Sequence, residues 1–247
     1  MGNLEPLKAL TNLRELRLSR TRIRSLEPLA ALASLRGLWI DGTQVSDLTP
    51  LKSHTSLEIL DVGHTAVADL EPLRALADLR TLWLPATQIN SLKSLESLAD
   101  LESLYLWGTK VSDLEPLKDL TNLQTLDLSR TKVRDIQPLR GLPRVQFLVL
   151  NQTGVNDLEP LRYLTSLQQL YLEDTPVTDL GPLAGLADLR VLCLAGTQVM
   201  DLTALKVLAG LKEIHLGGTK VRDEQIAELQ NTFPELKVIR HTEAVRK

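Results

Sequence analysis

This sequence of 247 residues has one cysteine, few aromatic side chains and little excess charge of either sign. Cys193 alone excludes an internal disulfide framework, and one cysteine with four histidines is too few for a cluster of metal ligands. The formal net charge of -3 and the isoelectric point near 5.9 lack the strong basic excess of a nucleic-acid-binding domain. No Gly-rich phosphate loop is present. We therefore expect no metal, no cofactor and no nucleic-acid partner.

Long apolar runs are also missing. No run approaches the roughly 18 apolar residues of a membrane span. The opening MGNLEPLKAL has no basic segment followed by an apolar stretch, which a signal peptide would have. These absences predict no membrane partner and a cytoplasmic location. A cell-surface or secreted location is the alternative if a segment preceding this chain carries a signal.

The sequence is dominated by one unit of 22 residues. Ten threonines stand 22 residues apart: Thr21, Thr43, Thr65, Thr87, Thr109, Thr131, Thr153, Thr175, Thr197 and Thr219. Leucine, or once isoleucine, stands five residues before each threonine, and an aliphatic residue stands three before it and two after it. The fourth residue after it is Asp in eight copies and Ser in two. The unit reads L-x-x-L-x-L-x-x-T-x-[VI]-x-[DS]-L-x-P-L-x-x-L.

Each part of the unit has a structural interpretation. The alternation L-x-L predicts a short strand with one buried face. The Asp or Ser predicts a helix N-cap, because its side-chain oxygen accepts a hydrogen bond from an unpaired backbone N–H. Proline follows three residues later in seven copies, where a first-turn N–H has no partner to lose. A turn or two of tight helix then leads to the next strand.

One unit cannot bury its own apolar face, but stacked units can. The sequence therefore predicts a right-handed α/β solenoid with a parallel concave sheet of about eleven short strands. Its convex side would consist of short 3-10 or α turns. We place the eleventh strand in FPELKV (233–238). The expected divisions are a partial repeat over 1–12, 22-residue repeats over 13–220 and a C-terminal capping repeat over 221–247.

With ten such units, the chain resembles leucine-rich repeat proteins, specifically the 22-residue class of bacterial internalin-like proteins and of a phosphatase-regulating nuclear subunit. The resemblance covers essentially the whole sequence. It implies a recognition or regulatory module, one domain of a larger bacterial signalling or host-interaction protein. The family's usual turn Asn is Thr in all ten copies. Because Thr offers one hydroxyl donor and its lone pairs, we expect a ladder of hydroxyls to replace the amide contacts.

The ends of the array depart from its middle. The first strand, expected over 13–18, would be an open sheet edge. Five arginines stand on or beside it: Arg14, Arg17, Arg20, Arg22 and Arg24. Charges on an edge discourage aggregation; an anionic partner or a neighbouring domain is the alternative. Because the sequence starts within a unit, we expect a fragment of a longer protein, and a short protein that tolerates this edge is the alternative.

Aromatic residues are placed selectively along the strands. Side chains alternate across a strand, so residues six, four and two before each threonine should face the concave surface if those five and three before it are buried. Trp39, four residues before Thr43, is therefore expected to face outward. Six of the eight aromatic residues share such positions: Trp39, Trp83, Tyr105, Trp107, Phe147 and Tyr171. Exposed large aromatics mark interaction surfaces, although aromatic ladders can also merely stabilise neighbouring strands.

Carboxylates accompany these aromatics and suggest the ligand. The predicted ligand-binding residues are Trp39, Asp41, Asp61, Trp83, Tyr105, Trp107, Asp127, Phe147 and Tyr171. Trp39 and Trp83 would stand about 10 Å apart with Asp61 between them, which suits a Lys or Arg held by cation–π contact and a carboxylate. We expect a monomer that binds a protein or peptide presenting Arg or Lys. The alternatives are a glycan-binding surface adhesin and a structural or homodimerising spacer.

No catalytic constellation is visible. His64 and His215 both face the concave side but lie seven strands apart, on the order of 30 Å. Cys193 stands one strand from His215, but its small neighbours offer no group to orient a nucleophile. His54 occupies a leucine position of the core, where a hydrogen-bonded structural histidine is expected. The chain is therefore predicted not to be an enzyme.

Overall fold

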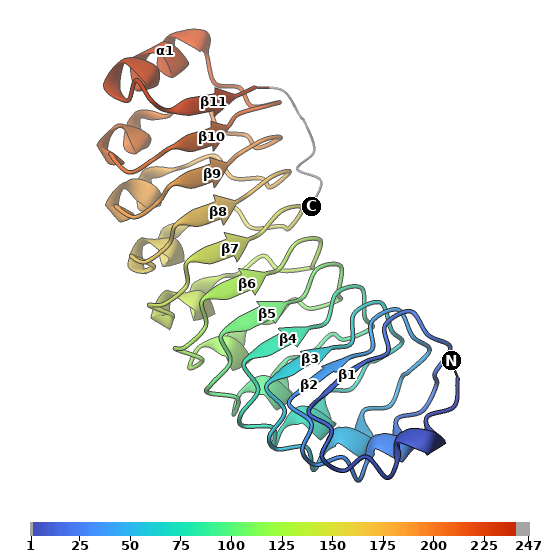
Figure 1. The fold of residues 1–247 in the computed structure, drawn as a ribbon. Helices are drawn as coiled ribbons and strands as arrows, with labels where there is room; N and C mark the ends of the chain where they lie inside the picture. The colour runs from blue at the N-terminus through green and yellow to red at the C-terminus, as the bar shows by residue number, and fades with distance from the viewer. Residues whose placement is uncertain (1, 241–247) are drawn as a thin grey trace.

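The computed structural model describes residues 2–240, which wind into an open arc of stacked repeats (Figure 1). One parallel sheet of 11 strands follows the order of the chain. Its strands are β1 (Glu15–Arg17), β2 (Gly37–Trp39), β3 (Ile59–Asp61), β4 (Thr81–Trp83), β5 (Ser103–Tyr105), β6 (Thr125–Asp127), β7 (Phe147–Val149), β8 (Gln169–Tyr171), β9 (Val191–Cys193), β10 (Glu213–His215) and β11 (Lys237–Ile239). Leu16 pairs with Leu38, and Leu38 with Leu60. The predicted solenoid and its register are confirmed.

Short 3-10 helices form the other side of the arc. They are η1 (Glu5–Leu7), η2 (Glu27–Leu29), η3 (Thr49–Leu51), η4 (Glu71–Leu73), η5 (Lys93–Leu95), η6 (Glu115–Leu117), η7 (Gln137–Gly141), η8 (Glu159–Tyr163), η9 (Gly181–Gly185) and η10 (Thr203–Val207). Asp47 Oδ1 accepts a hydrogen bond of 2.8 Å from the backbone N–H of Thr49, which opens η3. The N-cap residue is Leu48, not Asp47. The predicted cap is thus corrected by one residue: the aspartate bonds two residues ahead in an Asx turn that leads into the helix.

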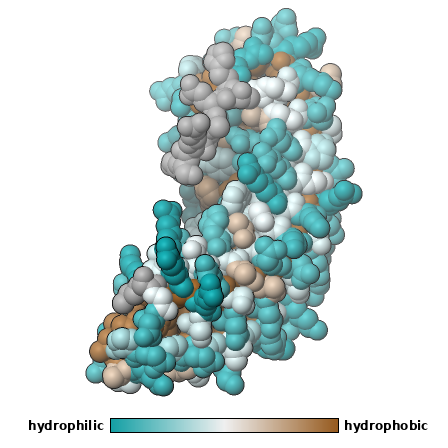
Figure 2. Space-filling model, turned by 90° about the vertical axis from the view of Figure 1, so that its right-hand side faces the viewer, coloured by the Kyte–Doolittle hydropathy of each residue, from teal (hydrophilic) through white to brown (hydrophobic). Residues whose placement is uncertain are grey.

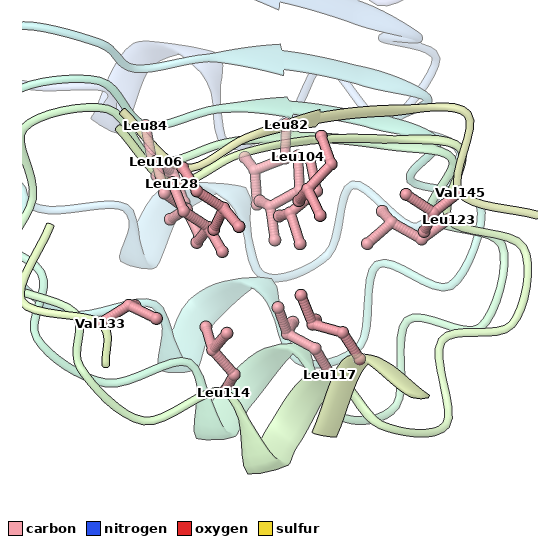
Figure 3. Close-up of a cluster of buried hydrophobic side chains, with 14 of the residues drawn as sticks. Leu82, Leu84, Leu104, Leu106, Leu114, Leu117, Leu123, Leu128, Val133 and Val145 are labelled. Atoms are coloured by element: carbon pink, nitrogen blue, oxygen red, sulfur yellow. The ribbon is translucent and has the colours of Figure 1, made fainter. Parts of the chain in front are cut away.

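The core is one continuous column of aliphatic side chains inside the arc. Four leucines from two successive repeats, Leu82, Leu84, Leu104 and Leu106, are all completely buried. Leu117 and its equivalents in the 3-10 helices face them from the opposite side (Figure 3). Equivalent residues stack from repeat to repeat, so each repeat buries its apolar surface against its neighbours.

The turn at each threonine has a recurring backbone conformation that the repeat pattern did not predict. The residue before each threonine has a positive φ: Arg20, Gly42, His64, Ala86, Gly108, Arg130, Gln152, Asp174, Gly196 and Gly218. Only glycine adopts this conformation without steric cost. The Thr65 hydroxyl donates to the carbonyl of Val62 at 2.6 Å, within its own turn. The predicted column of hydroxyl contacts is present in nine of the ten turns, and each hydroxyl donates to the carbonyl three residues earlier, within its own repeat.

The C-terminal repeat is longer than the others. Here α1 (Asp223–Thr232) takes the place of the 3-10 helix and buries Ile226 and Leu229. Ile214 of β10 pairs with Val238 rather than with Leu236. The predicted strand over 233–238 is therefore corrected to Lys237–Ile239, because the longer helix displaces the strand by two residues.

The N-terminal end is more open. β1 forms the other edge of the sheet, Leu13 and Leu16 are only partly buried, and Leu10 is 49% exposed. Hydrophobic surface is visible at this lower end of the molecule (Figure 2).

His54 lies at a leucine position of the core and is fully buried. Its Nε2 atom lies 3.1 Å from the Leu29 carbonyl oxygen. This is the hydrogen-bonded structural histidine that the sequence predicted.

Candidate binding face

Three columns of side chains, six, four and two residues before each threonine, point away from the core and form the concave face. In the middle column Asp61 stands between Trp39 and Trp83. Tyr105 and Asp127 follow on the next two strands. All five side chains are half-buried, while Leu38 and Ile40, the residues on either side of Trp39, are fully buried. The prediction that Trp39 lies outside the core is confirmed.

Trp39 lies flat over its own strand. A Cβ atom at Gly37 would come within 2.5 Å of the indole Cη2, so glycine leaves the room that the ring occupies. The Arg17 guanidinium carbon stands 4.1 Å from the ring centroid, and its Nη2 lies 3.3 Å from the Glu15 carboxylate. The cation that the sequence analysis assigned to a ligand is thus already supplied at Trp39 by the protein's own arginine.

Trp83, Pro85, Tyr105 and Trp107 form the centre of the concave face, and we call these four residues the aromatic block. The rings of Trp83 and Tyr105 stack with centroids 5.3 Å apart and an interplanar angle of 7°. Pro85 and Trp107 occupy the next concave column on the same two repeats. The result is a two-by-two apolar platform in which the stacked rings of Trp83 and Tyr105 hold each other in place.

Two side chains from neighbouring turns, Arg130 and His64, border the block at the turn edge. The Arg130 guanidinium carbon lies 5.4 Å from the Trp107 ring centroid. The His64 ring is 6.0 Å away and tilted by 54°. Both side chains come from the positive-φ position before a threonine, so the turn geometry places them beside Trp107.

One carboxylate flanks the block on each side. Asp61 Oδ1 accepts a hydrogen bond of 2.9 Å from the backbone N–H of Gly63. Asp127 Oδ1 accepts hydrogen bonds from Ser129, at 2.8 Å from its N–H and 2.5 Å from its hydroxyl. Burial, assisted by the charge of Asp41, raises the pKa of Asp61 above its ordinary value. Two equivalent turn bonds thus fix two carboxylates three strands apart.

A second aromatic pair lies beyond Asp127. The rings of Phe147 and Tyr171 have centroids 5.3 Å apart at 46°. The Tyr171 hydroxyl donates to Gln169 Oε1 at 2.9 Å, and burial raises the pKa of Tyr171. The predicted site residues therefore form three groups along the sheet, with Trp39 at one end, the aromatic block in the middle and Phe147 with Tyr171 at the other end.

The possible Cys–His pair does not form a nucleophilic site. Cys193 is completely buried, although its column predicted exposure. Burial, with the charges of Glu173 and Glu213, raises the pKa of Cys193 to about 12, so the unreactive thiol persists at neutral pH. His215 Nε2 lies 2.6 Å from Glu213 Oε1 and is held by this carboxylate.

Within residues 2–240, no group of three or more His, Cys, Asp or Glu side chains is placed to hold a metal ion. None of the helices formed by this part of the chain has the length and hydropathy that a membrane crossing requires.

Three contacts of the site were missed by the sequence analysis: Arg17 on Trp39, Arg130 on Trp107 and Ser129 on Asp127. Arg17 and Ser129 stand in concave columns, so their positions were a usable signal. Arg130 stands at the turn, and the direction of its side chain follows from the positive φ of its backbone. The four glycines at equivalent positions were the sequence signal for that conformation.

The stacked units, the parallel sheet and the 3-10 helices define a leucine-rich repeat solenoid, and this chain is a leucine-rich repeat protein. A family model described as leucine-rich repeats in two copies matches residues 11–53 and 99–141. The solved structure of an internalin (inlF) from Listeria monocytogenes superposes with a TM-score of 0.93 at 28% identity, covering 98% of this chain and 71% of that chain.

Other bacterial structures are similar to a lesser degree. Internalin C2 of Listeria monocytogenes has a TM-score of 0.65 at 28% identity, covering 85% of this chain and 83% of that chain. A leucine-rich repeat protein of Leptospira interrogans has a TM-score of 0.70 at 19% identity over 95% of this chain and 74% of its own, a likeness of fold alone. A comparison with curated proteins finds no match.

Proposed function

We propose that this protein is a non-catalytic, monomeric module that binds a protein or peptide partner on its concave face. The observation that carries the proposal is the aromatic block with a fixed carboxylate on each side. Large aromatic side chains dominate the energetics of protein interfaces. In this chain they gather on the solvent side of the sheet, and the sheet itself holds them in position. A rigid surface loses little conformational entropy on binding, which favours affinity.

The carboxylates favour a partner that presents Lys or Arg. Asp61 and Asp127 lie on the concave face beside aromatic rings, where a cation gains both a charge-assisted hydrogen bond and a cation–π contact. At Trp39 the protein's own Arg17 already makes this pair of contacts, with Glu15 as the carboxylate. That internal arrangement is an example of the recognition that we propose for the ligand.

The test is affinity capture of partners with mass-spectrometric readout. It compares the native chain with a variant carrying Trp39→Ala, Trp83→Ala and Trp107→Ala. The matched control carries Tyr163→Ala, Met200→Ala and Val207→Ala, three large hydrophobic residues that are exposed elsewhere. Circular dichroism must show equal folding for all three proteins.

A protein partner retained by the control and lost by the tryptophan variant supports the proposal. Equal capture by all three proteins contradicts it, since binding would then lie away from the concave face. Loss of capture on adding oligosaccharides would instead assign the face to a glycan. Light scattering at increasing concentration checks the monomer, and a dimer would favour a spacer role.

A further inference from the structure

Two carboxylates of the concave face stand on opposite sides of a stacked aromatic pair. Asp61 and Asp127 occupy the same column, with β4 and β5 between their strands. Three strand steps separate them, which is about 14 Å. Between them stand the stacked rings of Trp83 and Tyr105. The order along the solenoid is therefore carboxylate, aromatic pair, carboxylate.

Both carboxylates are oriented in the same way. In each, Oδ1 accepts the backbone N–H two residues ahead, from Gly63 or from Ser129. In neither does Oδ2 receive a hydrogen bond from any of residues 2–240. Each carboxylate thus has one oxygen fixed by the fold and one available to a donor from outside.

This spacing matches an extended peptide. A peptide in β conformation rises about 3.3 Å per residue, so residues i and i+4 stand about 13 Å apart. Their side chains, and that of residue i+2, point to the same side of the peptide. A peptide laid along the solenoid can therefore place two basic residues at the two carboxylates and its middle residue over the aromatic pair.

We propose that the concave face recognises an extended segment of the form basic-x-apolar-x-basic, running across strands β3 to β6. The inference rests on the proposed function and makes it specific. Lys or Arg at the first and last positions pairs with Asp61 and Asp127. The apolar side chain between them packs on Trp83 and Tyr105, with Pro85 and Trp107 beside it.

The experiment is calorimetric titration of the whole chain with capped synthetic peptides. Three peptides are compared, each with two lysines in an alanine background. The lysines are two, four or six residues apart, and in the peptide with the four-residue spacing a leucine stands midway between them. The proposal expects the four-residue spacing to bind about tenfold or more tightly than the others, the size of one charged hydrogen bond.

The variants Asp61→Asn and Asp127→Asn remove a charge but keep an oxygen that accepts the turn bond. Each should weaken the four-residue peptide about tenfold and should abolish the preference for spacing. The matched controls are Asp113→Asn and Asp135→Asn, whose aspartates form the same turn bond beside the 3-10 helices, with Glu115 and Gln137. They should leave the affinity unchanged.

A charge reversal gives the converse. A chain with Asp61→Lys and Asp127→Lys should bind the peptide in which both lysines are replaced by glutamate. Equal affinity at all spacings, no binding of any peptide, or equal weakening by the control variants would overturn the inference. The capture experiment separates this inference from the proposed function. If the peptide titration fails but replacing the three tryptophans abolishes capture of a protein partner, the proposed function stands without the peptide motif. If the replacement leaves capture unchanged, the proposed function and the peptide motif both fail.

Discussion

Leu104 and Tyr105 are neighbours on β5, but the two faces of the sheet that they represent follow opposite rules. The column of Leu104 contains leucine in nine repeats and isoleucine in one, and its residues from β2 to β10 are fully buried. The column of Tyr105 contains Arg, Trp, Asp, Tyr, Val, Cys and His. The inner column has to pack against its own copy in the next repeat inside a closed core, whereas residues of the outer column meet their neighbours in several ways, such as the stacking of Trp83 on Tyr105. Within these strands, variation is therefore concentrated on the outer face.

The strongest test of this difference replaces each neighbour with alanine. Leu104→Ala should lower the free energy of unfolding by about 2–5 kcal/mol, because it leaves a cavity between packed repeats. Tyr105→Ala should cost about 1 kcal/mol, since it removes one half-buried aromatic contact with Trp83. Urea unfolding monitored by circular dichroism measures both values, and equal losses would mean that the two faces are energetically alike.

His54 is the polar exception in the inner columns. Its Nδ1 has no hydrogen-bond partner among the described residues, and burial lowers its pKa below the ordinary value of 6.5. His54→Leu, which restores the residue of the equivalent positions, should raise the unfolding free energy by about 1–3 kcal/mol, the usual penalty of a buried unpaired group. The Leu29 carbonyl oxygen loses its contact with His54 in this variant, but it still accepts a hydrogen bond of 2.8 Å from the N–H of Leu32.

The same substitution should change the pH dependence. The folded protein keeps His54 neutral, while the unfolded chain binds a proton as the pH falls below about 6.5. Protonation therefore favours unfolding, and the native chain should lose stability from pH 6.5 downward until the folded-state pKa is reached. Urea unfolding at pH 8 and at pH 5.5 should show a greater advantage of His54→Leu at pH 5.5. An equal advantage at both pH values would contradict this assignment.

The turn column offers a smaller and reciprocal effect. Ala86 and Gly108 both have positive φ, at 52° and 69°. Gly108→Ala should cost about 1–2 kcal/mol, because a Cβ atom is disfavoured in this conformation. Ala86→Gly should be close to neutral or stabilising by up to about 1 kcal/mol, since relief of strain is offset by the entropy of glycine. The two substitutions are opposites at equivalent turns, and urea unfolding measures both. If both lowered the free energy of unfolding by a similar amount, side-chain contacts rather than backbone conformation would determine stability at these turns.

The repeat period was enough to predict the fold, because the same leucines recur at the same positions and only stacking buries them. The outward direction of Trp39 followed from strand alternation alone. The contacts between side chains could not be predicted in this way. Nothing in the repeat shows that Arg17 lies over Trp39 or that Trp83 and Tyr105 stack, because these contacts depend on the rotamers that neighbouring side chains adopt together. The displacement of β11 was missed because the length of α1 is decided by packing rather than by the period.

The threonine column provides the smallest effect and a control within the same protein. The Thr153 hydroxyl donates to the Leu150 carbonyl at 2.6 Å, whereas the buried Thr109 hydroxyl has no partner among residues 2–240. Thr153→Val should therefore cost about 0.5–1.5 kcal/mol, the net contribution of one hydrogen bond. Thr109→Val should be neutral or slightly stabilising, because valine keeps the shape and removes an unpaired buried hydroxyl. The difference in urea midpoint between the two variants, at unchanged slope, measures the turn bond itself. If Thr109→Val were as harmful as Thr153→Val, the β-branched shape of threonine, rather than its hydroxyl bond, would explain its presence in all ten turns.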